Sequence, residues 1–303
     1  MNKVNLCWVF SEGRKGHEIQ SMTLAHALAQ QVQLYPFTLK QPWLTFAPRR
    51  LPKFNLAVTW KEVPELSTSP DLIITTGRIA AAVGKHLKEI LNKQNSLCKH
   101  VQILNPKDKL SKYDWVLIPE HDQITGDNVI NFIGSIHPYD SQWFAQDKDS
   151  DFSQYLAIFV GNPKAHYFES KFAEEINTIH RHFSDRPLFF CGSPRLKPEN
   201  RKIITSLVRT QDKVWLNKTD GSNPYQSLLK NAKKIFVTSD SINMINEACA
   251  SYAPVSILAK DFIPSPKHAR FLDSIVSRCC DFKTLNVSTT LAPSPTLYKQ
   301  ILL

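Results

Sequence analysis

A histidine and two glycines follow the first apolar run of the sequence. The run covers residues 4–10, and Gly13, Gly16 and His17 come soon after it. Glycines let a backbone turn tightly and approach a ligand closely, and an imidazole can act as a general base or bind a hydroxyl or phosphate group. The spacing matches neither a G-x-x-x-x-G-K-[ST] phosphate loop nor a G-x-G-x-x-G dinucleotide motif. We predict a ligand-facing loop here, with a capping or surface role for His17 as the open alternative.

Ionisable residues follow two further apolar runs of the first half. Arg78 comes after residues 71–75, at the start of an expected helix. A cation there opposes the helix dipole, so we expect an anionic partner, either a ligand or an internal carboxylate. Glu120 and Asp122 follow residues 115–119. These carboxylates could bind hydroxyl groups or act as a general base, or belong to an ordinary polar turn.

In the second half, Ser193 and Arg195 follow the apolar run 187–192. A backbone N–H, a hydroxyl and a guanidinium at the end of a strand can together hold a diphosphate. This segment therefore predicts part of a nucleotide site.

A second part of that site is expected after residues 234–238. Hydroxyl and carboxyl side chains that suit a helix start come next, namely Ser239, Asp240 and Ser241. The helix that they open has an apolar face, and its other side carries a polar stripe of Asn243, Asn246 and Glu247. A carboxylate at the position of Glu247 could hold ribose hydroxyls, or the stripe could simply face solvent.

An Asn-Pro-Tyr segment precedes that run and opens another expected helix. It consists of Asn223, Pro224 and Tyr225. The tyrosine ring could stack on a nucleotide base or pack in the core.

The elements that would position these residues are short apolar runs alternating with amphipathic stretches. The runs are apolar on both alternations, as in strands covered on both faces: residues 4–10, 71–75, 100–104, 115–119, 129–132, 155–161, 187–192, 213–216, 234–238 and 254–258. Two helical stripes are predicted, one through Met22, Ala25, Ala29 and Val32, the other through Phe168, Phe172, Ile176 and Ile179. The alternation predicts an open α/β fold with parallel sheets.

Composition narrows the class of protein. The 303 residues are 42% hydrophobic and carry a net charge of +10. This excludes a disordered chain, and the longest apolar runs are too short for a membrane span or a signal peptide. We expect a cytoplasmic protein whose charge attracts phosphates or an anionic membrane surface, with a generally basic surface as the open alternative. The six scattered cysteines form no metal or redox motif, and no nucleic-acid-binding pattern is present.

A polar segment around residues 140–153 divides the chain. We predict one domain over residues 1–145, a second over 146–285, and a tail over 286–303 that ends in a helix from Thr296 and packs back on the first domain. Asp147 and Asp149 match the Asp-x-Asp spacing of metal-dependent glycosyltransferases but lie in this segment rather than after a strand. No metal site is therefore expected.

Taken in order, these segments resemble the mitochondrial fission Elm family, the elongated-mitochondria proteins of plants with many bacterial members. The resemblance spans residues 3–275 and is carried by Gly13-x-x-Gly16-His17-x-x-Gln20, Thr76-Gly77-Arg78, 119–122, Gly161-Asn162-Pro163-Lys164, 223–225 and, most specifically, 238–248. The family usually has Ser-Arg-Arg-Thr-Pro where this chain has Ser193-Pro194-Arg195-Leu196-Lys197-Pro198. In a later segment Tyr252 stands where the family usually has Gly.

The resemblance implies a GT-B-like fold, in which two Rossmann-like domains face a cleft. Bacterial members are regarded as glycosyltransferases similar in layout to the one that makes the lipid-linked peptidoglycan precursor. The second domain would take the nucleotide-sugar donor, with Ser193, Arg195 and residues 239–241 at the phosphates and Glu247 at the ribose. The first domain would take the acceptor, with His17 at the reaction centre.

We therefore expect a metal-independent glycosyltransferase that needs no cofactor beyond its nucleotide-diphosphate sugar. Its acceptor would be a lipid-linked or cell-envelope glycan, and His17, Glu120 or Asp122 would deprotonate it. A non-catalytic adaptor on a membrane surface and a nucleotide-sugar epimerase stay open as alternatives.

Overall fold

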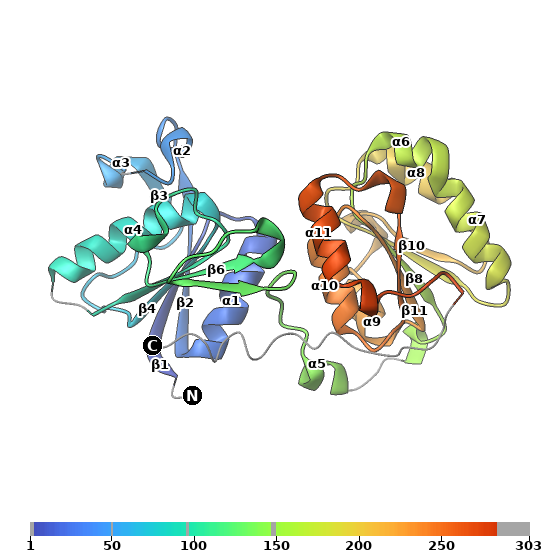
Figure 1. Ribbon diagram of the computed structural model, residues 1–303, viewed down its shortest axis with the longest axis horizontal. Coiled ribbons are helices and arrows are strands. Elements are labelled where there is room, and N and C mark those ends of the chain that lie inside the picture. Colours follow the sequence, from blue (N-terminus) through green and yellow to red (C-terminus); the bar gives the residue numbers. More distant parts are fainter. Residues whose placement is uncertain (1–2, 50, 95–96, 147–149, 284–303) are drawn as a thin grey trace. The chain divides into compact units, whose positions relative to one another are not determined.

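The computed structural model describes residues 3–49, 51–94, 97–146 and 150–283, and these form two compact units (Figure 1). The first unit ends at Pro138 and the second begins at Tyr139. The division thus comes before the predicted boundary at residue 145, because Tyr139 and Phe144 pack into the core of the second unit. The expected tail helix and the Asp147–Asp149 pair lie outside the described residues.

The first unit contains a seven-stranded sheet of order β3-β2-β1-β4-β5-β6-β7. Neighbouring strands are parallel except for β2 and β3, which are antiparallel. Their bounds are β1 Val4–Ser11, β2 Ala29–Leu39, β3 Val58–Trp60, β4 Leu72–Thr76, β5 Lys99–Ile103, β6 Trp115–Pro119 and β7 Val129–Phe132. The parallel α/β sheet expected from the apolar runs is confirmed, with an antiparallel edge strand added.

Strand β2 corrects the first predicted helical stripe. Helix α1 covers Lys15–Leu28 and stops where β2 begins. Ala29 and Val32 therefore lie in a strand, where Ala29 pairs with Val4 and Val32 with Cys7 of β1. Their three-residue spacing resembled a helix, but pairing with β1 gives backbone groups of this segment hydrogen-bond partners and decides its conformation.

Two longer helices cover the faces of this sheet. Helix α1 packs through Leu24 and Leu28 against Cys7 and Val9 on one face. Helix α4, Gly77–Lys93, packs on the other face, together with the short helices α2 (Trp43–Phe46) and α3 (Phe54–Ala57). Two short 3-10 helices follow later strands, η1 at Leu110–Lys112 and η2 at Glu120–Asp122.

The second unit contains a parallel five-stranded sheet of order β10-β9-β8-β11-β12. The strands are β8 Leu156–Val160, β9 Leu188–Gly192, β10 Lys213–Trp215, β11 Lys234–Thr238 and β12 Val255–Leu258. All five were predicted as apolar runs, with ends that differ by at most one residue.

Helices cover both faces of this second sheet. One face carries α6 (Ala165–Tyr167), the π-helical turn η4 (Phe168–Phe172), α7 (Ala173–His182) and α8 (Pro198–Ser206). The other carries α5 (Ser141–Ala145), α9 (Tyr225–Asn231), α10 (Ile242–Ala250) and α11 (Pro266–Ser274). The second predicted stripe, Phe168 to Ile179, is confirmed, since its four residues are buried.

Both sheets reverse their strand order once. In the first unit the reversal lies between β1 and β4, and in the second between β8 and β11. In open parallel sheets the crevice beyond the carboxyl ends of such a strand pair is where ligands bind. The predicted site residues follow these strands or their neighbours, so the topology determines which of them come together.

Candidate functional site

Asp240 lies at the strand reversal of the second unit and links the segments that follow β8 and β11. Its carboxylate accepts hydrogen bonds from the Thr238 hydroxyl at 2.7 Å and from the backbone N–H of Asn162 at 2.7 Å. Gly161 has no side chain because there is no room for one: a Cβ there would lie 2.4 Å from Asp240 Oδ2. Both carboxylate oxygens thus join the ends of β8 and β11, and the predicted phosphate-facing role of Asp240 gives way to a structural one.

The hydroxyl groups of two serines predicted at the site also make hydrogen bonds within the protein. The Ser193 hydroxyl donates to the Gly161 carbonyl at 3.0 Å and accepts the Arg195 N–H at 3.3 Å. The Ser239 hydroxyl donates to the Ala259 carbonyl at 2.8 Å. These side chains shape the loops rather than point outward.

What remains available at this edge is a helix start and a guanidinium. Helix α10 begins after Ser241, whose side chain makes no capping hydrogen bond. Its first N–H groups carry the positive end of the helix dipole. Arg195 is exposed. Asn162 Oδ1 is buried and has no hydrogen-bond partner among the described residues. The N–H groups and the guanidinium suit a phosphate group. The Asn162 oxygen suits a hydroxyl of the same ligand that could donate to it.

His268 of α11 also lies at this edge and was not predicted. Its Nδ1 is 2.8 Å from the Ser265 hydroxyl, and its ring contacts the backbone of Asp240. Burial lowers the pKa of His268, the hydrogen bond to the Asp240 backbone and the charge of Asp240 offset part of that change, and the charges of Lys267 and Arg195 lower the pKa further. The only sequence signal was its place soon after the last strand.

Glu247 forms a half-buried hydrogen-bonded pair with Tyr225. The Tyr225 hydroxyl donates to Glu247 Oε2 at 2.5 Å. Burial raises the pKa of Glu247 to about 7, and the bond from Tyr225 offsets part of that rise. Burial and the nearby carboxylate also raise the pKa of Tyr225 well above its usual value. The sequence predicted both residues but not that they meet.

The Tyr225 ring is packed rather than free. It lies 4.7 Å from the Phe159 ring, measured between centroids, and packs half-buried against the core of the second unit, which favours the core alternative over a stacking surface. Asn223 Oδ1 accepts the Tyr225 N–H at 2.9 Å and thereby starts helix α9. On α10, Asn243 is half-buried while Asn246 is buried, so the predicted polar stripe does not face solvent as a whole.

In the first unit the strand reversal carries a carboxylate–imidazole pair. His17 Nδ1 lies 2.8 Å from Glu12 Oε1, with the Glu12 side chain 8% and the His17 side chain 23% exposed. A carboxylate that accepts Nδ1–H leaves the lone pair on Nε2, which is the arrangement of a general base. Sequence reasoning selected His17 and overlooked Glu12, although Glu12 lies only five residues before it.

Glycines leave room for the His17 ring and allow the backbone turn before it. The His17 ring lies over Gly77, where a Cβ would be 2.7 Å from His17 Cε1 and where φ is +77°. Gly13, with φ +86°, has open space around it, so it is needed for its backbone conformation alone. Gly16 lies in the first turn of α1, and its carbonyl accepts from Gln20 Nε2 at 3.3 Å.

Glu120 and Asp122 lie apart from His17. They form η2 after β6, and β6 is three strands from β1 in the sheet. Three strand spacings amount to about 14 Å. The structure therefore places the three predicted catalytic residues at one edge of the sheet but does not bring the two carboxylates to the imidazole.

The partners of Arg78 correct another expectation. Its guanidinium donates to the Leu44 carbonyl at 3.2 Å and to the Ala47 carbonyl at 2.7 Å. Backbone oxygens thus take the place of the predicted anion, because the segment around α2 passes directly beside the start of α4.

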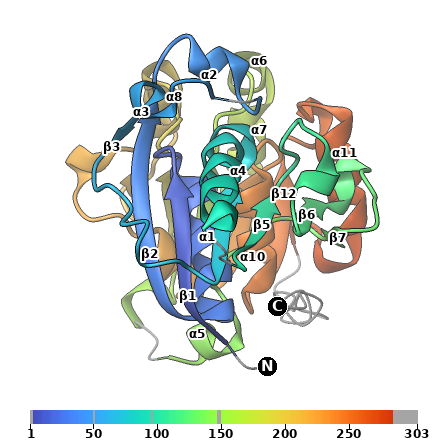
Figure 2. The same ribbon diagram turned by 90° about the vertical axis from the view of Figure 1, so that its left-hand side faces the viewer.

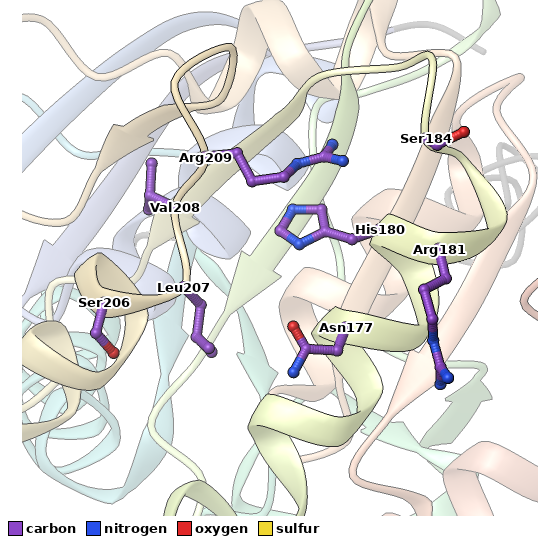
Figure 3. A pocket seen from close by; sticks show the side chains of 8 residues that line it. All are labelled: Asn177, His180, Arg181, Ser184, Ser206, Leu207, Val208 and Arg209. Carbon is purple, nitrogen blue, oxygen red and sulfur yellow. The ribbon is translucent and has the colours of Figure 1, made fainter.

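Figure 3 shows a hollow at the opposite, amino end of the second sheet. It has a volume of about 780 Å³ and is lined by Asn177, His180, Arg181, Ser184 and residues 206–209. Asp212, fully buried nearby, accepts from the Leu188 and Arg209 N–H groups and lies 3.0 Å from His180 Nε2. Arg209 lies 3.5 Å from that buried carboxylate, Arg181 donates to the Thr178 hydroxyl, and no predicted site residue lines the hollow.

The described ranges contain neither a metal-binding cluster nor a membrane-spanning helix. No group of three or more His, Cys, Asp or Glu side chains is arranged to hold a metal ion there. Among the same residues no helix is both long and apolar enough to cross a membrane.

Comparison with known proteins gives a family and a fold. The family model described as Mitochondrial fission ELM1 matches residues 15–281. An uncharacterised Rickettsia prowazekii protein, RP120, is 26% identical over 89% of this chain and 88% of its own. The glycotransferase of kitacinnamycin is similar in structure, with TM-score 0.51 and 14% identity, covering 99% of this chain and 93% of that one. UDP-GlcNAc 2-epimerase from Neisseria meningitidis has TM-score 0.50 and 11% identity, covering 97% of each chain.

Proposed function

The chain belongs to the mitochondrial fission ELM1 family, and from that starting point we propose that it is a GT-B glycosyltransferase. In this proposal it transfers a sugar from a nucleoside-diphosphate donor to a lipid-linked or cell-envelope glycan. The observation that carries the proposal is the complementary chemistry of the two strand reversals: a carboxylate-oriented imidazole in one unit, and a helix start with a guanidinium in the other. The fold shared with a glycotransferase agrees with this class.

The second unit binds the donor in this proposal. The diphosphate lies at the start of α10, where the free N–H groups, the Ser241 hydroxyl and Arg195 offset its charge. When the bond to the sugar breaks, its electron pair goes to the diphosphate oxygen, and the same groups stabilise the charge that develops there. The ribose hydroxyls donate to Glu247, in place of the Tyr225 hydroxyl that occupies the carboxylate now.

The first unit activates the acceptor. His17 Nε2 takes the proton of the acceptor hydroxyl as that oxygen bonds to the sugar. Glu12 keeps the imidazole in the required tautomer and stabilises its protonated form. The groups at the second strand reversal provide the positive charge at the leaving group, so the proposed reaction needs no metal ion.

A non-catalytic adaptor is the second candidate, and the family description, which refers to mitochondrial fission, favours it. An adaptor has no need to bind a nucleotide. Donor binding therefore separates the two candidates.

Thermal unfolding with UDP, GDP, CMP or ADP tests the proposal. A nucleotide that binds only the folded protein raises Tm, and at a hundred times its Kd it adds about 2.7 kcal/mol of stability. We expect one of the four to raise Tm. Glu247→Ala should weaken that binding by about 1–3 kcal/mol, the range for a lost hydrogen bond to a charged group.

Glu199→Ala, which removes an exposed glutamate from α8, is the matched control and should bind as the unmodified protein does. A folded Glu247→Ala protein with unchanged affinity would limit Glu247 to a structural role. If none of the four nucleotides changes Tm, the adaptor becomes the better description.

A further inference from the structure

The segment between β2 and β3, residues 40–57, forms a small folded lobe that includes α2 and α3. Figures 1 and 2 show these two helices at one end of the first unit's sheet, beyond the carboxyl end of β2. Because β1 and β2 are parallel, this is also the edge that carries His17. Neither the strand reversal nor the proposed reaction uses the lobe, so its surface needs another explanation.

The lobe has its own packed interior. Leu51 is 3% exposed and Phe54 9%, and the Phe54 ring stacks on His86 of α4 with centroids 4.0 Å apart. The Trp43 indole N–H donates to the Pro52 carbonyl at 2.8 Å. Lys85 of α4 donates to the Pro48 carbonyl at 2.8 Å, and Arg78 holds two more carbonyls. The side chains on its outer surface are therefore held there by a defined structure.

Two large apolar side chains point outward from this lobe. Phe46 of α2 is 50% exposed and Leu56 of α3 is 60% exposed. Single exposed apolar residues are common on protein surfaces, and others in the described chain, such as Leu97 and Val276, lie on separate elements. Here two occur within one lobe that otherwise buries its apolar side chains.

The charged residues of the lobe are all basic. Residues 40–57 contain Lys40, Arg49, Arg50 and Lys53 and no acidic residue, and the nearest acids along the chain are Glu18 and Glu62. Lys40, Arg49 and Lys53 are exposed. An anionic bilayer surface binds a segment that exposes both apolar side chains and cations, because the apolar groups enter the interface while the cations meet the lipid phosphates.

We propose that this lobe docks the first unit on an anionic membrane surface. Phe46 and Leu56 enter the headgroup boundary, and Arg49 and Lys53 lie among the phosphates. Arg78, which holds the lobe, directly follows Gly77, the residue under the His17 ring. A membrane at the lobe thus lies beside the edge where a lipid-linked acceptor would meet His17. The docking stands whether or not the transfer reaction does.

The test is co-sedimentation of the whole protein with vesicles of phosphatidylcholine, with and without about one third phosphatidylglycerol. We expect binding to the anionic vesicles alone, and weaker binding at high salt. The double variant Phe46→Ser/Leu56→Ser should lower the partition coefficient about tenfold or more, and Arg49→Glu/Lys53→Glu should do the same.

Matched controls carry equivalent changes elsewhere. Leu97→Ser removes a 94% exposed leucine at the opposite end of the sheet, and Lys202→Glu/Lys218→Glu reverses two exposed cations of the second unit. Both should bind vesicles as the unmodified protein does. Circular dichroism and Tm confirm that each variant is folded.

Three results would overturn the proposal. One is equal binding to neutral and anionic vesicles, and another is no binding to either. The third is a change from dimer to monomer, by light scattering, in Phe46→Ser/Leu56→Ser, which would make the lobe a contact between copies of the chain. Nucleotide binding is measured without lipid, so a failure here leaves the donor proposal intact.

Discussion

Glu12 and His17 lie five residues apart, on either side of the turn that starts α1. The turn brings the carboxylate to Nδ1 and leaves Nε2 as the acceptor of a proton. Gly77, from a distant part of the chain, provides the flat surface under the ring. A general base in this position depends on the correct tautomer as much as on the histidine itself.

Glu12→Gln tests that dependence. In an assay of transfer, or of slow donor hydrolysis, His17→Ala should lower kcat by about 10²–10⁴-fold. Glu12→Gln should lower kcat similarly, because an amide can donate to Nδ1 and stabilise the wrong tautomer. Nucleotide affinity should stay unchanged for both variants, since the donor binds the other unit.

Nitrogen chemical shifts of the His17 ring provide a readout that needs no activity. The unmodified protein should show the Nδ1–H form, and Glu12→Asp should retain it. Glu62→Gln, on an exposed glutamate, is the control. If Glu12→Gln leaves both the tautomer and kcat as they were, Glu12 does not position His17.

At the scale of elements, β5 contains a histidine that the fold keeps neutral. His100 is fully buried, and burial followed by the charge of Lys88 lowers its pKa to about 3. The Thr75 hydroxyl donates to Gln102 Oε1 at 2.6 Å, so it accepts from His100 Nε2–H at 2.7 Å. His100 Nδ1 has no hydrogen-bond partner among the described residues, and a proton there would be a buried, unpaired charge.

His100 should therefore make stability depend on pH. Between pH 3 and the unfolded value of about 6.5 the unfolded chain binds one more proton than the folded one, so stability rises with pH by about 1.4 kcal/mol per unit and levels off above 6.5. Urea unfolding at several pH values should show a smaller rise for His100→Gln than for the unmodified protein. His182→Gln, on the surface of α7, is the control. Equal slopes in all three proteins would contradict the prediction.

The join between β8 and β11 is a second element-scale feature. Gly161→Ala should destabilise the second unit by about 2–4 kcal/mol, because the new methyl group displaces the Asp240 carboxylate from its two hydrogen bonds. The measurement is the free energy of unfolding in urea. In an Asp240→Ala background the same methyl group has room, so Gly161→Ala should cost little there. Additive effects of the two changes would show that they act independently.

At the scale of the molecule, the chain consists of two units, each with its own sheet, core and strand reversal. If the donor binds the second unit alone, its effect on backbone protection should be confined to that unit. Hydrogen exchange with and without the nucleotide that raises Tm should show slower exchange after β8, β9 and β11 and no change after β1 and β4. Equal protection in both units would contradict a donor site built by the second unit alone.

The same scale explains how far the fold could be predicted. The apolar runs identified ten of the twelve strands that the described residues form, since buried parallel strands need apolar side chains on both faces. Strand β2 was missed because Gln30, Gln31 and Gln33 break its apolar pattern and Val32 continued a helical spacing. Strand β3 has three residues, too few for any periodicity.

For the candidate site, too, some features could be predicted from the sequence and others could not. The sequence by itself determined which polar residues follow the strand ends, because that order is a property of the chain, and from it His17, Arg195 and Glu247 were selected as candidates. Only the tertiary structure decided their partners. Tyr225 bonds to Glu247 across 22 positions and Asp240 to Asn162 across 78. Such pairs leave no local pattern, since parallel pairing brings together strand ends that are distant in sequence, and each carboxylate is then used by whichever donor that pairing places within hydrogen-bond distance.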